Sequence, residues 1–269
     1  MAFSKEIEAF IREYVKDIAK DNAAIFADAG MSKSAGFVDW AEFLRDIADE
    51  IGHDLIALAQ FHVNEHKGYA KLSRKIIEEF SEQAEPSESH SILARLPIRT
   101  YWTTNYDTLI EDTLRQAYKV PDVKHSVEQL NTTRPKRDVV VYKMHGDVSY
   151  PNSAVLYKEQ YERYFRTHEP FVRALSGDLV SKTFLFIGFS FTDPNLDYVL
   201  SRLHSVTKRH HYCFMRREQV LPGDDDDVKK YKQVLRVNDL KRFGIQTLLI
   251  DDYAEVPRIL AAIEARFLK

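Results

Sequence analysis

The sequence contains little of several features that would assign it to particular protein classes. It has one cysteine, Cys213, among 269 residues, so an intrachain disulfide framework and a four-cysteine zinc module are excluded. The segment around Cys213 is apolar, and we expect the thiol to pack inertly in a buried strand. Acidic and basic residues nearly balance, at a formal net charge of −3, so there is no general attraction to nucleic acid or to an anionic membrane. We therefore predict no resident metal, no nucleic-acid partner and no membrane partner.

Long apolar runs are also missing. The longest are strand-length, whereas a helix that spans a bilayer needs about 20 apolar residues. The first residues, Met-Ala-Phe-Ser followed by the charged segment Lys5–Glu8, do not resemble a cleavable signal. We therefore expect a cytoplasmic protein. The apolar fraction of 44% with 29% charged residues is typical of a globular domain.

Short apolar runs alternate with amphipathic segments along the chain. Strands are predicted near residues 23–27, 99–104, 138–144, 183–187, 211–215 and 245–250, and helices near 7–18, 109–114, 157–181, from 193–195 onward and 256–267. Four further helical patterns, near 40–51, 54–66, 69–82 and 90–96, lie between the first two strands. This order predicts an α/β fold, a Rossmann-like doubly wound parallel sheet with a helical insertion after the first strand. We expect one domain over residues 1–269, with residues from about 40 to 96 packed as a helical cap.

Polar residues gather where four of the predicted strands end. The segments are 28–32, 104–107, 145–147 and 188–195. Each has an ordinary structural explanation when taken alone, as a helix cap, a core histidine or a turn. In an open parallel sheet, however, ligands bind outside the carboxyl ends of the strands, near the point where strand order reverses. Four such segments after four strands therefore favour a binding site.

These same segments resemble the NAD-binding motifs of the sirtuins. Residues 29–39, Ala-Gly-Met-Ser-Lys-Ser-Ala-Gly-Phe-Val-Asp, resemble the sirtuin loop Gly-Ala-Gly-Ile-Ser followed by Ala-Gly-Ile-Pro-Asp. Thr104–Asp107 resembles Gln-Asn-Ile-Asp, Met144–Gly146 resembles Leu-His-Gly, and Gly188–Ser190 corresponds to Gly-Thr-Ser. The whole chain is similar to the sirtuin-like half of the Thoeris anti-phage effectors, most closely over residues 101–107, 143–147 and 174–198.

The resemblance implies an NAD glycohydrolase, which cleaves NAD to nicotinamide and ADP-ribose and depletes NAD as an anti-phage abortive-infection effector. NAD is then the substrate, and Asn105 and His145 are the catalytic residues. The residues implied in NAD binding are Asp28, Ala29, Gly30, Met31, Ser32, Asp39, Thr104, Asp107, Gly188, Ser190, Asp193 and Asn195. The resemblance also implies a homo-oligomer, specifically a tetramer, and a regulatory domain or partner protein that senses a cyclic ADP-ribose signal.

The chemistry of these residue types agrees with that reading. A glycine-rich turn into a helix lets backbone N–H groups approach a diphosphate. Rupture of the nicotinamide–ribose bond releases a neutral leaving group, so the enzyme mainly has to position NAD and stabilise an oxocarbenium-like centre. Asn105 can hold the attacking water and a ribose hydroxyl, and His145 can act as general base. We expect Asp107 to accept from the nicotinamide carboxamide, and Ser190 and Asn195 to bind the adenosine ribose.

Departures from the sirtuin pattern narrow this expectation. The zinc module is missing, Trp40-Ala41 replaces the sirtuin Phe-Arg, and no segment resembles the one that holds an acyl-lysine peptide, so water is favoured as the acceptor. Asp28 stands at the first glycine position, where a carboxylate near the diphosphate would cost roughly 1–4 kcal/mol. Its side chain can instead turn away, cap the next helix or bind a ribose hydroxyl. Two alternatives stay open: a non-catalytic oligomer that senses NAD or an ADP-ribose-type nucleotide, and an NAD-dependent deacylase lacking zinc.

Overall fold

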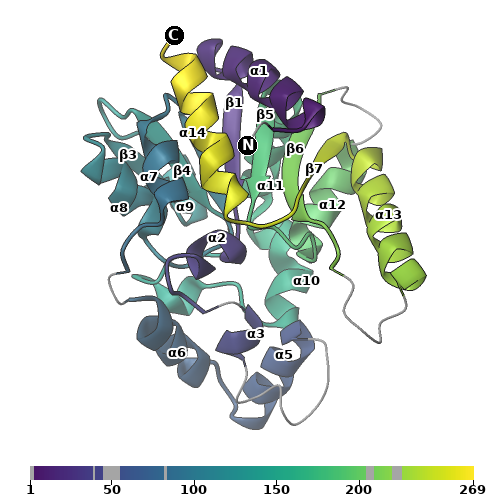
Figure 1. Cartoon of the computed structure of the whole chain (residues 1–269). Helices are drawn as coiled ribbons and strands as arrows, with labels where there is room; N and C mark the ends of the chain where they lie inside the picture. The colour runs from purple at the N-terminus through teal and green to yellow at the C-terminus, as the bar shows by residue number, and fades with distance from the viewer. Residues whose placement is uncertain (1–2, 39, 45–54, 82–83, 204–208, 220–225) are drawn as a thin grey trace.

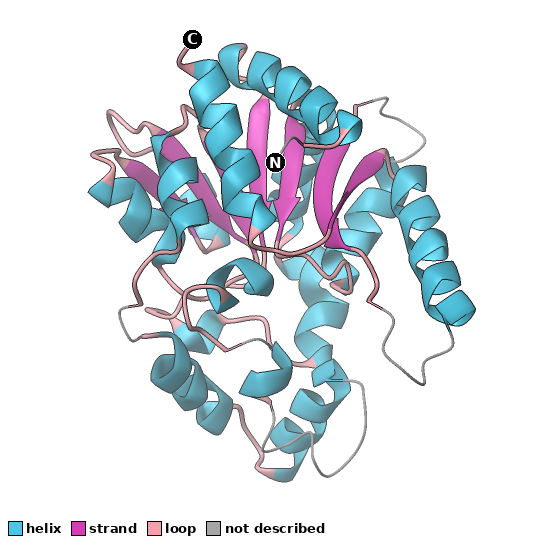
Figure 2. Cartoon of the chain, viewed as in Figure 1, coloured by secondary structure: helices cyan, strands magenta, loops and turns pink. Residues whose placement is uncertain are grey.

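A single parallel sheet forms the centre of the molecule (Figures 1 and 2). The computed structural model describes residues 3–38, 40–44, 55–81, 84–203, 209–219 and 226–269. The strands are β1 (Ala23–Ala27), β2 (Thr100–Thr103), β3 (Pro121–Lys124), β4 (Val139–Lys143), β5 (Thr183–Ile187), β6 (His211–Arg216) and β7 (Ile245–Ile250). They form one seven-stranded sheet in the order β3-β4-β2-β1-β5-β6-β7, and every strand pair is parallel.

Strand order reverses at β1, which confirms the predicted doubly wound, Rossmann-like sheet. From β1 the chain builds outward through β2 and β4 on one side, and through β5, β6 and β7 on the other. Ile25 of β1 is in register with Tyr101 of β2 and Leu185 of β5. The crevice expected for a ligand therefore lies at the carboxyl end of β1, between the loops that follow β2 and β5.

The edge strand β3 was not predicted from the sequence. Its residues, Pro-Asp-Val-Lys, contain no apolar run. Proline lacks a backbone N–H, but it is tolerated at the start of an edge strand, and Pro121 occupies that position beside Val139. The charged residues pair with each other, because Lys124 Nζ lies 2.8 Å from Asp122 Oδ1.

Helices cover both faces of the sheet. One face carries α1 (Lys5–Ala19), α7 (Glu88–Arg95), α8 (Leu109–Gln116) and α14 (Glu255–Phe267). The other carries α9 (Val127–Leu130), α10 (Lys158–Thr167), α11 (Glu169–Ser181), α12 (Pro194–Leu203) and α13 (Asp226–Arg242). Side chains of β1 alternate between the two cores, with Ile25 in the first and Phe26 in the second. This alternation is the period of two expected of a strand buried on both sides.

The described residues between β1 and β2 are mostly helical, as predicted. It contains α2 (Ala29–Lys33), α3 (Trp40–Phe43), α5 (Leu55–Glu65), α6 (Ala70–Phe80) and α7. Figure 1 shows α3, α5 and α6 as a separate helical lobe beyond the carboxyl end of the sheet, whereas α7 packs on the sheet beside α8 and α14. Of the helix predicted near 40–51, residues 45–51 lie outside the described residues.

Two helical predictions differ from the structure in detail. The stretch predicted as helical over 157–181 is two helices, α10 and α11, which meet at His168, with Pro170 in the first turn of α11. Helix α13 was not predicted, since charged residues occur on all sides of it.

Cys213 is buried in β6, where burial raises the pKa of its thiol to about 11, which fits an inert role. None of the described helices is long and apolar enough to cross a membrane.

Candidate functional site

Four loops meet at the carboxyl end of the sheet. They follow β1, β2, β4 and β5, the central strands of the order given above, and each begins with a polar segment predicted to belong to the site. In Figure 2 these loops lie between the lower end of the strands and the helical lobe. Parallel strands end at the same edge, which is why residues from positions 28, 105, 145 and 193 come together.

A buried chain of hydrogen bonds joins the loop after β2 to helix α2. The Asn105 side-chain amide donates to Ser32 Oγ at 2.8 Å, and the Ser32 hydroxyl donates to Asp107 Oδ2 at 2.7 Å. The other Asp107 oxygen accepts from the Leu109 backbone N–H at 3.0 Å, at the start of α8. All three side chains are buried. Among the described residues nothing hydrogen-bonds the Asn105 oxygen Oδ1, so this oxygen can accept from a water or a ribose hydroxyl.

His145 is buried and faces two polar residues from the loop after β5. Its Nε2 atom lies 3.3 Å from Asp193 Oδ2 and 3.4 Å from the Asn195 amide nitrogen. Asn195 can donate to Nε2 when the ring is neutral, and Asp193 can accept from Nε2–H when the ring is protonated. The neutral and the protonated His145 ring therefore each have a hydrogen-bond partner at Nε2, which suits a group that takes up and releases a proton. Asp193 also accepts from the Leu196 backbone N–H at 2.8 Å, which caps α12.

Asp28 does not cap the helix that follows it. Its backbone stands at the N-cap position of α2, but its side chain makes no capping hydrogen bond. It accepts instead from the hydroxyl of Thr104. Burial raises the pKa of the Asp28 carboxyl, and the nearby Asp193 raises it further against the opposing effect of Thr104. The side chain thus turns toward the β2 loop, and the alternative that it caps the next helix is wrong.

Two glycines allow the first and fourth loops to touch. The Gly30 N–H donates to the Gly188 carbonyl at 3.1 Å. Gly188 has φ of +72°, and a Cβ added there would lie 2.2 Å from the backbone nitrogen of Met31. This approach therefore needs glycine. In this structure the Gly30 N–H joins the first loop to the fourth.

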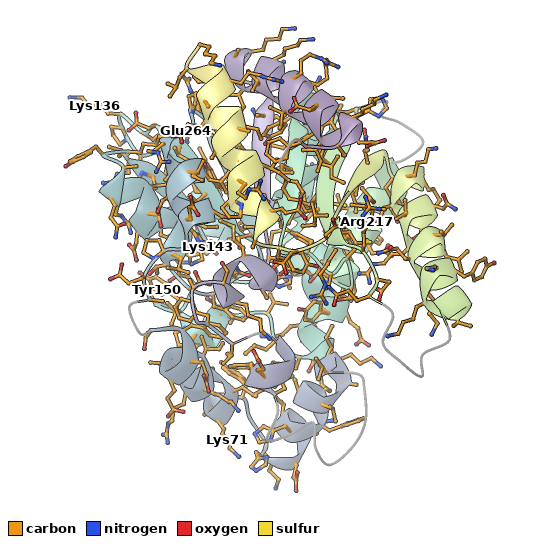
Figure 3. All side chains as sticks on the ribbon, in the orientation of Figure 1. Lys71, Lys136, Lys143, Tyr150, Arg217 and Glu264 are labelled. Carbon is orange, nitrogen blue, oxygen red and sulfur yellow. The ribbon has the colours of Figure 1, made fainter. Side chains whose placement is uncertain are left out.

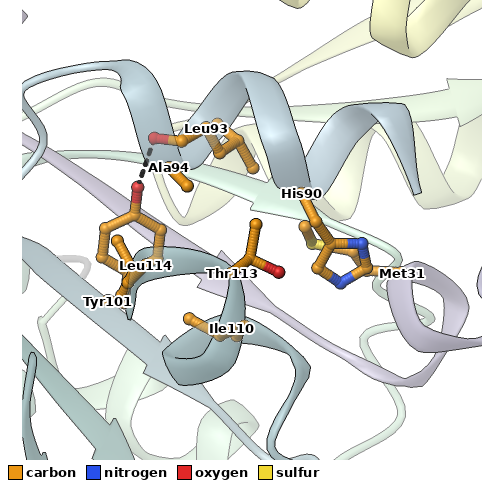
Figure 4. A pocket seen from close by; sticks show the side chains of 8 residues that line it. All are labelled: Met31, His90, Leu93, Ala94, Tyr101, Ile110, Thr113 and Leu114. Atoms are coloured by element: carbon orange, nitrogen blue, oxygen red, sulfur yellow. Dashed lines mark hydrogen bonds between the residues drawn. The ribbon is translucent and has the colours of Figure 1, made fainter. Parts of the chain in front are cut away.

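Not every predicted residue faces this crevice. The Met31 side chain is buried in the core cluster beneath α7 and α8, and Figure 4 shows it beside His90 at the wall of a small apolar cavity. Ser190 is exposed, and its hydroxyl lies 2.7 Å from that of Thr192. Ala29 is half-buried. Asp39 lies outside the described residues. Among the described residues, no group of three or more His, Cys, Asp or Glu side chains is arranged to hold a metal ion.

The structure adds Tyr161, a residue that was not predicted from the sequence. It comes from α10, and its ring packs edge-on against His145, with ring centroids 5.3 Å apart. Burial raises the pKa of its phenol, and the charge of Asp193 acts in the same direction. Among the described residues no group hydrogen-bonds this hydroxyl, so it can bind a substrate. Tyr161 could not be recognised from the sequence, because it lies within a helix rather than after a strand.

The chain is similar in sequence to one domain family and to several known proteins. Residues 99–238 match the SIR2-like domain family. The chain is 50% identical over 277 aligned positions to the NAD(+) hydrolase ThsA of Bacillus cereus (strain MSX-D12), a match covering 98% of this chain and 58% of that protein. It is 46% identical over 277 positions to the protein of the same name from Acinetobacter baumannii (strain 532279), covering 98% and 58% respectively. For that of Cytobacillus dafuensis the identity is 44% over 285 positions, covering 99% and 58%.

The chain spans less than two thirds of the length of these relatives. The match to the SIR2-like domain includes the loops that carry Asn105, His145 and Asp193, and it extends over more than half of the chain. This protein therefore belongs to the SIR2-like family.

Proposed function

We propose that this protein hydrolyses the bond between nicotinamide and ribose in NAD, releasing nicotinamide and ADP-ribose. The observation that carries the proposal is the pairing of His145 with both Asp193 and Asn195, at the same edge of the sheet as the Asn105–Ser32–Asp107 chain. The relatives described above are named NAD(+) hydrolases, which supports the same activity here.

The proposed reaction needs a base, a held water and a stabilised cation. The C–N bond between ribose and nicotinamide breaks, and its electron pair returns to the pyridine nitrogen, which leaves as neutral nicotinamide. Water held by Asn105 Oδ1 forms the new C–O bond and gives its proton to His145 Nε2. The Asp193 carboxylate stabilises the imidazolium until solvent takes the proton.

The charge of the crevice suits the positive centre formed in this reaction. Asp107, Asp193 and Asp28 contribute carboxyl groups at its wall. A positive oxocarbenium-like centre is stabilised by negative groups fixed in advance around it. Burial raises the pKa of the Asp28 carboxyl. The Asp28 carboxyl and the Thr104 hydroxyl are then available to a ribose hydroxyl.

NAD is proposed to lie along the four loops. The nicotinamide carboxamide donates to Asp107, whose oxygens each retain a free lone pair. The diphosphate lies against the turn into α2, Ala29–Ser32, and near Gly188. The adenosine ribose binds Ser190 and Asn195. The Asn195 oxygen Oδ1 is buried and has no hydrogen bond among the described residues, so it is suited to accept from a ribose hydroxyl.

The biological setting follows from the resemblance to the Thoeris effectors. We propose one SIR2-like domain over residues 1–269 that acts in the cytoplasm, as a tetramer, to deplete NAD during phage infection. Activity is proposed to be released by a regulatory domain or partner protein that senses a cyclic ADP-ribose signal. Gel filtration with NAD cleavage measured across the peaks tests the tetramer directly.

Product analysis tests the proposed reaction. Purified protein is incubated with NAD, and nicotinamide and ADP-ribose are quantified. Asn105→Ala and His145→Ala are each expected to lower turnover by about 10²- to 10⁴-fold, since each removes a group that acts on the reacting atoms. Matched controls are Asn64→Ala and His66→Ala, exposed residues of the same types in α5 and directly after it, and these should retain wild-type turnover.

Each alternative function predicts a different outcome. NAD binding without any product at every protein concentration supports the sensing oligomer and overturns the hydrolase. Release of O-acetyl-ADP-ribose only when an acetylated peptide is added supports the deacylase. Wild-type rates from both Asn105→Ala and His145→Ala contradict the residue assignment.

A further inference from the structure

A fully buried lysine lies directly beneath the proposed site. Lys143 is the last residue of β4, two positions before His145, and its side chain has no exposed surface. It continues the inward-facing row of Val139 and Val141 on the side of the sheet that α7 and α8 cover. Figure 3 labels it near the lower end of the sheet. A lysine is almost never fully buried unless its charge is paired, so its contacts need an explanation.

The Lys143 ammonium is surrounded by acceptors from three segments. Its Nζ atom donates to the backbone carbonyls of Tyr106 at 3.1 Å and Asp107 at 2.6 Å. It also lies 3.0 Å from Glu111 Oε1 and 2.5 Å from Asp147 Oδ2. Three N–H groups therefore serve four acceptors, and no donor remains for a substrate. Lys143 acts on other residues and not on NAD itself.

The electrostatics of the cluster keep the lysine charged. Burial alone would lower the pKa of Lys143, but Glu111 and Asp147 together raise it above its ordinary value. Burial raises the pKa of Glu111, whose second carboxylate oxygen has no hydrogen bond among the described residues. The cluster therefore holds one cation and two carboxyl groups, so loss of the lysine leaves buried carboxyl groups without a counter-charge.

The contacts of Lys143 connect the two loops that carry the proposed catalytic residues. Tyr106 and Asp107 directly follow Asn105, and the Asp107 side chain holds Ser32, which in turn binds the Asn105 amide. Asp147 lies two residues after His145, in the same loop after β4. A single ammonium group thus fixes the backbone after Asn105 against the loop of His145.

We propose that Lys143 is a positioning residue for NAD cleavage, which sets the Asn105 loop against the His145 loop without contacting the substrate. The proposal rests on the proposed function. Lys143 touches neither Ser190 nor Asn195, so binding of the adenosine end does not depend on it. Loss of Lys143 therefore lowers kcat and leaves the affinity for ADP-ribose nearly unchanged.

The chain provides a matched control in Lys124. This residue is also buried at the carboxyl end of a strand, β3, and it also pairs with an aspartate and a backbone carbonyl, those of Asp122 and Thr132. It contacts neither catalytic loop. Lys124→Met therefore reports what the loss of a buried lysine does to stability alone.

The experiment compares Lys143→Met with Lys124→Met in the whole chain. Melting temperature, kcat, KM for NAD and the dissociation constant for ADP-ribose are measured for each folded variant. Lys143→Met is expected to lower kcat by about 100-fold, the effect of misplacing reacting groups by about 1 Å, with ADP-ribose binding within about threefold of wild type. Lys124→Met should lower the melting temperature but leave kcat within about threefold.

Several outcomes overturn the proposal. It fails if folded Lys143→Met keeps a wild-type kcat, or if Lys124→Met loses as much kcat. If Lys143→Met does not fold, the double variant that combines Lys143→Met with Glu111→Gln is used, because it removes one uncompensated carboxylate. The kcat of that double variant then tests the proposal. If the wild type releases no nicotinamide, the proposed function fails. Crystal structures then decide on Lys143: a displaced 105–108 loop supports its positioning role, and an unchanged loop overturns it.

Discussion

The two halves of the crevice differ in how their polar side chains are held. In the reacting half, formed by Ser32 and the loops after β2 and β4, Asn105 and Asp107 are buried and joined through the Ser32 hydroxyl, and buried His145 is held by Asp193 and Asn195. In the adenosine half, formed by residues 188–192, Ser190 is exposed and bonds only to Thr192 among the described residues. The first arrangement suits groups that must meet a transition state in fixed positions, and the second suits groups that only bind.

This difference leads to a division of kinetic effects. Substitutions in the reacting half should lower kcat, because they displace groups that act on the breaking bond. Substitutions in the adenosine half should raise KM, because they remove binding that is equal in the ground state and the transition state. Asp193 and Asn195 join the halves through His145.

A large effect, though below that expected for Asn105→Ala and His145→Ala, is expected from Ser32→Ala in the reacting half. The change removes both hydrogen bonds that hold Asn105 against Asp107, and it leaves a buried amide and a buried carboxylate without their partner. Hydrogen bonds to charged groups contribute about 1.5–3 kcal/mol, so kcat should fall by about 10- to 100-fold. Steady-state release of nicotinamide measures it.

Ser34→Ala is the matched control for Ser32→Ala. Ser34 is two residues further along, and its hydroxyl donates only to the Met31 carbonyl. It should retain wild-type kcat. A Ser32→Ala protein that keeps full kcat would show that the reacting half tolerates rearrangement, which contradicts the comparison between the halves.

Much of the sheet, and the position of the four loops, could be predicted from the sequence. The apolar runs at 23–27 and 183–187 became β1 and β5, because continuous apolar residues fit a strand buried on both faces. The polar segments after four strands became the four loops, because parallel strands end at one edge. By contrast, β3 was missed because its stability comes from pairing with β4 and from the Lys124–Asp122 ion pair, neither of which has a local pattern.

The partners of the site residues could not be predicted, for a related reason. His145 meets Asp193 across 48 residues of sequence, and Lys143 meets Glu111 across 32. Such pairings depend on how strands are ordered in the sheet, which hydrophobic periodicity does not specify. Tyr161 reaches His145 from a helix, so no rule about strand ends could have found it. Resemblance identified residue types, and only the fold gave their contacts.

A pH effect on stability is expected from His90, which lies behind the reacting half. The ring is buried beside Met31, and burial lowers the pKa of His90 from 6.5 to about 4. Between these values the unfolded chain binds a proton that the folded chain does not. The free energy of unfolding therefore falls as pH decreases through this window, by about 2 kcal/mol between pH 7 and pH 5 for this one group.

Urea unfolding at pH 7 and pH 5 measures this effect. His90→Asn keeps a polar group near Ser87, which lies 2.8 Å from the His90 ring nitrogen, and removes the titration. The variant should lose less stability than the wild type over the same interval. His211 in β6 has its pKa lowered to about 4 by burial as well, so part of the slope should remain. An unchanged slope in His90→Asn would contradict the assignment.

The smallest effect is expected from Ser190→Ala in the adenosine half. Ser190 is exposed and is proposed to bind a ribose hydroxyl, and a hydrogen bond of this kind contributes about 0.5–1.5 kcal/mol. KM for NAD should therefore rise by about two- to tenfold with kcat unchanged. Ser201→Ala, which removes an exposed hydroxyl of α12 that donates to the Tyr198 carbonyl, should change neither constant. If Ser190→Ala instead lowers kcat at constant KM, the adenosine half takes part in positioning the reacting groups, and the loop after β5 cannot be treated as a binding surface alone.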